Sequence, residues 1–123
     1  MTELSDRRQE KRKVVMAFTL VYELENGKLL GYLRDLTLRG AQVNGEKTMK
    51  INTQTTLSID LPGDLPAITV GRLHIPARVV RCQKEEGSET SYEIGFEFKE
   101  LQQEQIRIID SILERYHFRH KLY

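Results

Sequence analysis

Two short groups of polar residues have the types and spacing to bind a ligand. The first is Arg8-x-x-x-Arg12, with Arg7 directly before it. Guanidinium groups are always charged, planar and forked, so they can bind a phosphate or the O6 and N7 acceptors of guanine through paired hydrogen bonds. Four residues of extended chain span roughly 13 Å, which lets the two forks reach separate parts of one nucleotide-sized ligand. Because arginine pairs are common, this spacing alone predicts only a solvated charged segment.

The second group is Asp35-x-Thr37-x-x-Gly40. In an extended strand, residues 35 and 37 face the same side, so a carboxylate and a hydroxyl would stand together. The carboxylate can accept hydrogen bonds from guanine N1–H and N2–H or hold an arginine, and the hydroxyl can donate to a phosphate or a carbonyl. Gly40 offers a backbone amide with no Cβ in the way of a flat ligand. The competing interpretation is a strand that ends at a glycine bulge, with both polar side chains merely exposed.

Catalytic and metal-binding motifs are weak by comparison. His117 and His120 are three residues apart near the end of an expected helix, where imidazole also favours the helix dipole. His74 has no partner at ligand spacing, and Cys82 is best interpreted as a buried structural thiol. No glycine-rich loop precedes a helix. We therefore predict a protein that is not an enzyme and that carries neither a metal nor a cofactor.

Composition predicts one soluble domain. The chain has 123 residues, of which 39% are hydrophobic and 30% charged. Because no apolar run approaches the eighteen or so residues of a spanning helix, we expect no membrane insertion. The N-terminus lacks an apolar secretion segment, and the single cysteine fits a reducing compartment, so we expect a cytoplasmic protein.

The charge is concentrated at the N-terminus. Up to residue 13 there are five basic and three acidic residues, which leaves a near-neutral remainder of net charge −1 in a chain of net charge +1. We predict that residues 1–12 form a flexible basic arm and that residues 13–123 form a single domain. So small an excess of charge argues against DNA binding but suits a small anion.

Most of the domain alternates as strands do. Residues 13–24 are rich in β-branched and aromatic side chains, and Asn26-Gly27 predicts a hairpin turn into a strand over 29–38. Residues 68–83 predict one long or two short strands, with Pro76 marking a bend or an edge. Further strands are expected over 41–43, 56–61 and 92–98.

The pattern changes period near the C-terminus. Ile106, Ile109, Leu113 and Tyr116 recur at helical spacing, which predicts an amphipathic helix over about 101–118. A small domain with many short antiparallel strands usually closes, because open edges invite aggregation. The predicted fold is therefore mainly β: a six- or seven-stranded antiparallel barrel with a C-terminal helix.

Together, the order and spacing of the two motifs, with a small barrel and a helix, resemble the PilZ domain family. The segment Tyr92–Phe98, "YEIGFEF", is also similar to a late strand of that family. The resemblance implies a bacterial receptor for the second messenger cyclic di-GMP, in which Arg8 and Arg12 contact guanine edges and phosphates. The other motif positions would be Asp35, Thr37 and Gly40, with threonine in place of the usual serine.

The resemblance also implies a mode of action. An arginine directly before the first motif, here Arg7, accompanies binding of an intercalated pair of ligand molecules, and Arg81 would add a contact at the rim. Ligand binding would change the conformation of the N-terminal arm and signal to a protein effector that the sequence does not identify.

Two other functions stay open. A PilZ-like domain can act as a protein-interaction module that does not bind the nucleotide. A small barrel can also bind RNA, although the aromatic residues amount to only 7% and do not cluster with the arginines as a stacking surface would.

Overall fold

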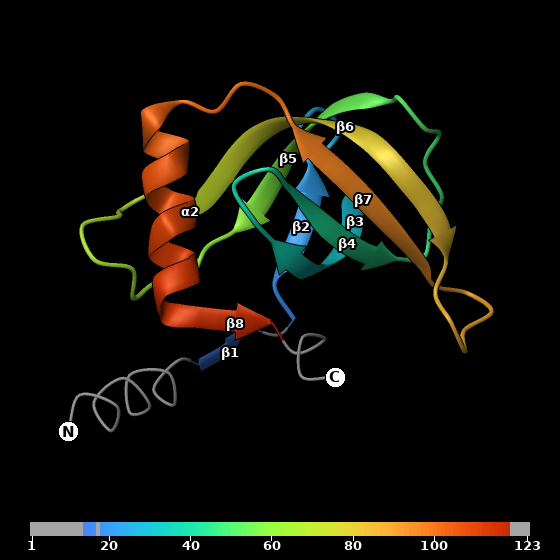
Figure 1. The fold of residues 1–123 in the computed structure, drawn as a ribbon, viewed down its shortest axis with the longest axis horizontal. Coiled ribbons are helices and arrows are strands. Elements are labelled where there is room, and N and C mark those ends of the chain that lie inside the picture. The colour runs from blue at the N-terminus through green and yellow to red at the C-terminus, as the bar shows by residue number, and fades with distance from the viewer. Residues whose placement is uncertain (1–13, 17, 119–123) are drawn as a thin grey trace.

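The computed structural model describes residues 14–16 and 18–118 (Figure 1). The elements are arranged along the chain as β1 (Val14–Met16), β2 (Leu20–Glu23), β3 (Leu29–Leu36), β4 (Gly40–Gly45), β5 (Gln54–Asp60), β6 (Arg72–Lys84), β7 (Tyr92–Phe98), α2 (Gln103–Arg115) and β8 (Tyr116–Phe118).

Six of the strands close into a barrel in the order β2-β3-β4-β7-β6-β5. All of the pairings within the barrel are antiparallel. Each barrel strand therefore has a partner on both sides, and closure leaves no unpaired edge among the described barrel strands. The predicted mainly-β fold with a C-terminal helix is confirmed, with six strands in the barrel.

Strict alternation places the apolar residues inside the barrel. Along β6, Leu73, Ile75, Ala77 and Val79 are each at most 3% exposed, while the residues between them are exposed or half-buried. Cys82 is half-buried and packs against this core. The side-chain period of two thus turns the sequence pattern directly into an inner and an outer face.

Pro76 lies in the middle of one long strand, so the expected bend or edge takes a different form. The barrel pairing of β6 with β7 begins one residue later, at Ala77 opposite Phe98. The Pro76 carbonyl accepts a hydrogen bond from the amide of Lys99, just beyond the end of β7, at 3.1 Å. Pro76 lacks an N–H, but the N–H would point toward β7 at a position where β7 has already ended. The proline therefore removes no hydrogen bond from the pairing of β6 with β5 or with β7.

Helix α2 stands beside the barrel and is attached to it at several points (Figure 1). Ile108, Ile109 and Ile112 are at most 2% exposed and pack into the core. At the start of the helix, the Gln105 side chain accepts from the Gln102 amide at 2.6 Å and donates to the His74 carbonyl of β6 at 2.9 Å.

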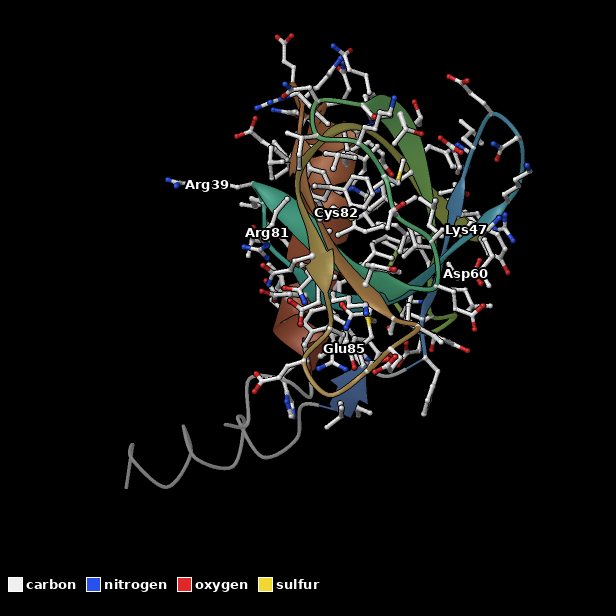
Figure 2. The ribbon with its side chains drawn as sticks, turned by 90° about the vertical axis from the view of Figure 1, so that its right-hand side faces the viewer. Arg39, Lys47, Asp60, Arg81, Cys82 and Glu85 are labelled. Carbon is white, nitrogen blue, oxygen red and sulfur yellow. The ribbon has the colours of Figure 1, made fainter. Side chains whose placement is uncertain are left out.

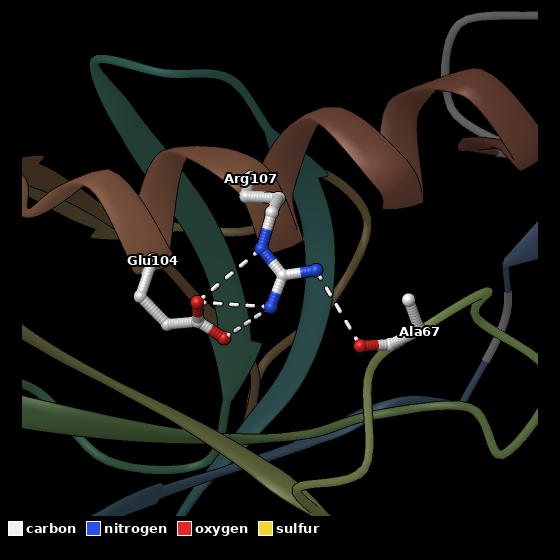
Figure 3. A network of polar contacts seen from close by, with 3 residues as sticks. All are labelled: Ala67, Glu104 and Arg107. Carbon is white, nitrogen blue, oxygen red and sulfur yellow. Dashed lines mark hydrogen bonds and ion pairs between the residues drawn. The ribbon is translucent and has the colours of Figure 1, made fainter.

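A second attachment joins α2 to the connection between β5 and β6. Arg107 pairs with Glu104, one turn earlier, at 2.6 Å, and its other terminal nitrogen donates to the Ala67 carbonyl at 3.4 Å (Figure 3). These contacts are exposed, so they contribute orientation more than stability.

The helix ends earlier than predicted. Residues 116–118, expected to be helical, form β8, which pairs in parallel with β1 so that Val14 lies opposite Tyr116. Met16 and Phe118 are 6% and 2% exposed, and both belong to the core. The helical spacing of Tyr116 was misleading because burial of Phe118 and pairing with a distant segment favour an extended chain there.

A small polar cluster fixes the junction of α2 and β8. The Tyr116 hydroxyl donates to Asp64 Oδ1 at 2.5 Å, and Arg115 approaches Asp64 Oδ2 at 3.3 Å. The hydrogen bond from Tyr116 lowers the pKa of the Asp64 carboxyl below its ordinary value. Burial, followed by the interaction with Asp64, raises the pKa of the Tyr116 hydroxyl.

This cluster predicts a pH-dependent contribution to stability. Because the folded-state pKa of Asp64 is lowered from 3.8, its contribution is fully present above about pH 4 and is lost as the pH falls through the lowered pKa. We expect wild type to be more stable than Asp64→Asn at pH 6 and the difference to shrink below pH 4, as followed by urea unfolding. Tyr116→Phe, which removes the main partner, should show the same pH window. A difference that is constant from pH 3 to pH 7 would contradict this assignment.

Candidate ligand-binding site

Four of the seven predicted site residues line one groove on the outside of the barrel. Asp35, Thr37, Gly40 and Arg81 surround a hollow of about 290 Å³ formed by β3, β4, β6 and β7 and by the turn between β3 and β4. Arg39, Gln42, Gly95 and Glu97 also line it. The remaining three predicted residues, Arg7, Arg8 and Arg12, lie outside the described residues.

The centre of the groove is a row of residues that crosses four neighbouring strands. Asp35 on β3 lies opposite Gln42 on β4. Gln42 in turn lies opposite Gly95 on β7, and Gly95 lies opposite Arg81 on β6. Residues that are 46 positions apart in sequence are thereby brought onto one surface, with a carboxylate at one end and a guanidinium at the other.

Irregularities in two strands turn both charged residues outward. The pairing register shifts between Leu33 and Asp35, and again between Val79 and Arg81. Under strict alternation, Asp35 would share the inner face with Leu33 and Arg81 the inner face with Val79. One extra residue in each strand reverses the facing of the residues after it, so that the charges point outward.

The sequence carried a signal for these bulges that the motif analysis missed. In β3 the buried residues Leu33 and Leu36 are three apart, where a regular strand would bury residues two apart. In β6 the same interval separates Val79 from Cys82, which packs against the core. An apolar spacing of three inside a strand of period two is the expected trace of one inserted residue.

Gly95 creates the flat floor of the groove. A Cβ at this position would stand 3.4 Å from Arg81 Cβ and 3.6 Å from Arg81 Nη2, so the arginine side chain lies across the glycine. The same Nη2 donates to Gln42 Oε1 at 3.3 Å. In the sequence, Gly95 stands out only as part of a strand pattern, whereas the structure places it beneath the guanidinium of Arg81.

Thr37 stabilises the turn rather than standing beside Asp35 on a strand. Strand β3 ends at Leu36, so the expected shared face on an extended strand is wrong. The Thr37 hydroxyl oxygen accepts from the amides of Arg39 and Gly40 at 3.1 and 3.2 Å, and the Thr37 amide donates to the Gly40 carbonyl at 2.9 Å. The hydroxyl hydrogen has only a long contact of 3.4 Å with that carbonyl, which leaves it able to donate to a ligand.

Gly40 is required by strand packing. It lies opposite Glu97 of β7, and a Cβ built on it would overlap the carbonyl oxygen of Phe96. Its amide, expected to be open to a ligand, already donates to the Thr37 hydroxyl. The glycine of the motif is thus explained by close approach of two backbones, independently of any ligand.

Positive charge gathers at one rim of the groove. Arg39, in the turn, and Arg81, on β6, extend from the same side of the barrel (Figure 2). Glu97, the acidic residue on the opposite strand, is engaged by Arg78 at 2.7 Å. Because Glu97 is paired with Arg78, Arg39 and Arg81 provide positive charge at this rim. The site is therefore suited to an anionic group beside the carboxylate of Asp35.

Metal-binding clusters and membrane-spanning helices are absent from the described part of the chain. In residues 14–16 and 18–118, no three histidine, cysteine or acidic side chains are arranged to hold a metal ion. No helix within these residues is both long enough and apolar enough to cross a membrane.

Comparison with known proteins gives one match. The family model of the PilZ domain matches residues 6–115, which include both sequence motifs and all six barrel strands. No curated protein and no solved structure matches the chain.

The packing of Gly40 predicts a specific loss of stability. Gly40→Ala should lower the free energy of unfolding by about 1–3 kcal/mol, because the added methyl group overlaps the Phe96 carbonyl and forces β4 from β7. Gly63→Ala is the matched control, since no atom lies within 4 Å of a Cβ built there. Urea unfolding of the two variants measures the difference, and equal stabilities would show that Gly40 has no packing role.

Proposed function

The chain belongs to the PilZ domain family, and we propose that it is a bacterial receptor for cyclic di-GMP that binds the nucleotide without transforming it. The main support is the row across four strands that joins Asp35, Gln42, Gly95 and Arg81 in one outer groove. The groove offers an acceptor, a flat floor and a cation, which match the donor edge, planar base and phosphate of a guanine nucleotide.

Each group in the groove has a role in this proposal. The Asp35 carboxylate accepts hydrogen bonds from guanine N1–H and N2–H. Arg81 leaves its long hydrogen bond with Gln42 to meet a phosphate, and the base lies over Gly95 in the place that the Arg81 guanidinium vacates. The Thr37 hydroxyl donates its hydrogen to a second polar atom of the ligand.

The N-terminal arginines complete the proposed site. Arg12 precedes the first residue of β1, Val14, by two positions, a distance of about 7 Å of extended chain. Arg8 and Arg12 then supply two forks for guanine and phosphate, and Arg7 stacks on a guanine of a second, intercalated ligand molecule.

Signalling results from the change in this segment. The ordering of a basic segment around the nucleotide costs part of the binding free energy, and that cost makes the bound conformation dependent on the ligand. The repositioned N-terminal arm presents a surface that a protein effector in the cytoplasm recognises. The output is therefore carried by a partner rather than by a reaction.

A specific observation also supports the second candidate, a PilZ-like interaction module that does not bind the nucleotide. Thr37 and Gly40 are both accounted for by the turn and by strand packing, so their presence does not require a ligand. Direct measurement of binding separates the two functions.

Isothermal titration with cyclic di-GMP tests the proposal. We expect Arg8→Ala, Arg12→Ala and Arg81→Ala each to weaken binding roughly 5- to 150-fold, the equivalent of about 1–3 kcal/mol for one guanidinium fork. The control is Arg72→Ala, which removes a guanidinium from the same strand as Arg81 but one that pairs with Asp60 at 2.9 Å. The absence of heat with folded wild type at high micromolar ligand would favour the interaction module.

A further inference from the structure

We propose that a second cavity, at the end of the barrel where β4 and β6 finish, docks a peptide segment of the effector in which an apolar side chain is flanked by lysine or arginine. The cavity has a volume of about 400 Å³ and an apolar side made by Met16, Phe18, Tyr32 and Leu33. It shares no lining residue with the nucleotide groove. The signalling role of this cavity rests on the proposed receptor function.

An exposed aromatic pair marks the entrance to this cavity. Phe18 is 80% exposed and Tyr32 is 45% exposed, and their rings meet edge to face at 6.0 Å between centroids. Phe18 also has a φ of +62°, a left-handed conformation that is strained for a bulky residue. A strained backbone that holds a phenyl ring in solvent, beside buried Met16, is typical of a recognition surface rather than of core packing.

An unpaired donor favours a peptide as the occupant. Nε of Arg34, whose side chain lines the cavity, is buried and has no hydrogen-bond partner among the described residues. A buried donor left without an acceptor is costly. The backbone carbonyl of a docked peptide supplies such an acceptor, which a purely hydrocarbon ligand does not.

The charge of the rim selects a basic partner. Two acidic residues, Glu46 and Glu85, line the cavity together with one basic residue, Arg34. The segment 85–93, which carries the chain from the end of β6 into β7, contains four glutamates and no lysine or arginine. Complementary charge increases the rate of encounter and excludes acidic segments, while the apolar side and aromatic pair supply the affinity.

A chain of side-chain hydrogen bonds connects this cavity to the nucleotide groove. Arg81 Nη2 donates to Gln42 Oε1 at 3.3 Å, and Gln42 Nε2 donates to Asn44 Oδ1 at 3.2 Å. Asn44, only 6% exposed, then donates through Nδ2 to Glu85 Oε1 at 2.5 Å. Ser91 donates to the same Glu85 oxygen at 3.2 Å.

The first of these hydrogen bonds is the one that a ligand would break. It is long, and in the proposed function a phosphate draws Arg81 away from Gln42. Gln42 is then released to reorient, and the change reaches Glu85 through the buried Asn44. Binding of nucleotide and binding of peptide therefore alter each other's affinity, by the same factor in both directions.

The test uses the full chain and three synthetic peptides of equal length. The first has a Leu-Phe-Leu centre flanked on each side by a Lys-Arg pair, the second replaces the four basic residues by glutamate, and the third replaces the centre by Ser-Gly-Ser. We expect only the first to give saturable NMR shifts at Phe18, Tyr32 and Glu85. Equal binding by the first and third peptides, or shifts confined to other surfaces, would overturn the proposal.

Variants of the surface provide the matched comparison. Phe18→Ala and Glu85→Gln should each weaken binding of the first peptide at least fivefold. Ile51→Ala, at a side chain that is 52% exposed, and Glu25→Gln, in the exposed turn after β2, should leave that affinity unchanged. Wild-type peptide affinity in either Phe18→Ala or Glu85→Gln would contradict the assignment.

Titration in the presence of saturating cyclic di-GMP tests the connection separately. We expect the peptide affinity of wild type to change at least threefold when nucleotide is added. In Gln42→Ala, the ratio of peptide affinities with and without nucleotide should be close to one. If nucleotide binds and the ratio in wild type is already one, the hydrogen-bond connection is wrong. If no nucleotide binds, the proposed receptor function fails, while specific binding of the first peptide still supports the docking surface.

Discussion

Closure of the barrel is the constraint on which the rest of this structure depends. A closed antiparallel sheet requires each strand to bury alternate side chains, and β3 and β6 meet that requirement by including extra residues, one of which in each strand lies beside the groove. The inserted residues keep Leu36 and Cys82 directed to the core while Asp35 and Arg81 face solvent. The polar groove is therefore a consequence of how the core is completed.

A separate two-stranded sheet, formed by β1 and β8, holds the two ends of the described chain together. The short parallel pair of β1 and β8 places the residues just after the N-terminal arginine motif beside the end of α2 (Figure 1). Met16 and Phe118 anchor the pair in the core, and Tyr116 binds Asp64 in the connection between β5 and β6. Strand β1 is therefore adjacent to the end of the helix and to that connection, a position that the proposed signalling mechanism uses.

The two proposed binding sites differ in the physical interactions that they offer. The groove offers charge and a flat floor, whereas the cavity at the barrel end offers exposed aromatic rings within an acidic rim. They are connected by polar side chains on neighbouring strands, with Asn44 buried between them. Asn44 is buried while the Arg81 end of the chain is exposed, and we propose that displacement of Arg81 by a ligand alters the contacts of Glu85 at the other end.

The sequence by itself determined the fold class, because period-two alternation, hairpin turns and one helical period are local properties, and the bulges in β3 and β6 interrupt the alternation at only a few positions. It also indicated Asp35, Thr37, Gly40 and Arg81, which do share one groove. Only the tertiary structure decided that Thr37 and Gly40 build a turn, that Gly95 forms the floor, and that the helix yields to β8 at Tyr116. Those outcomes depend on strand register and on contacts between segments that are distant in the sequence. The spacing of neighbouring residues carries no information about the energies of such contacts.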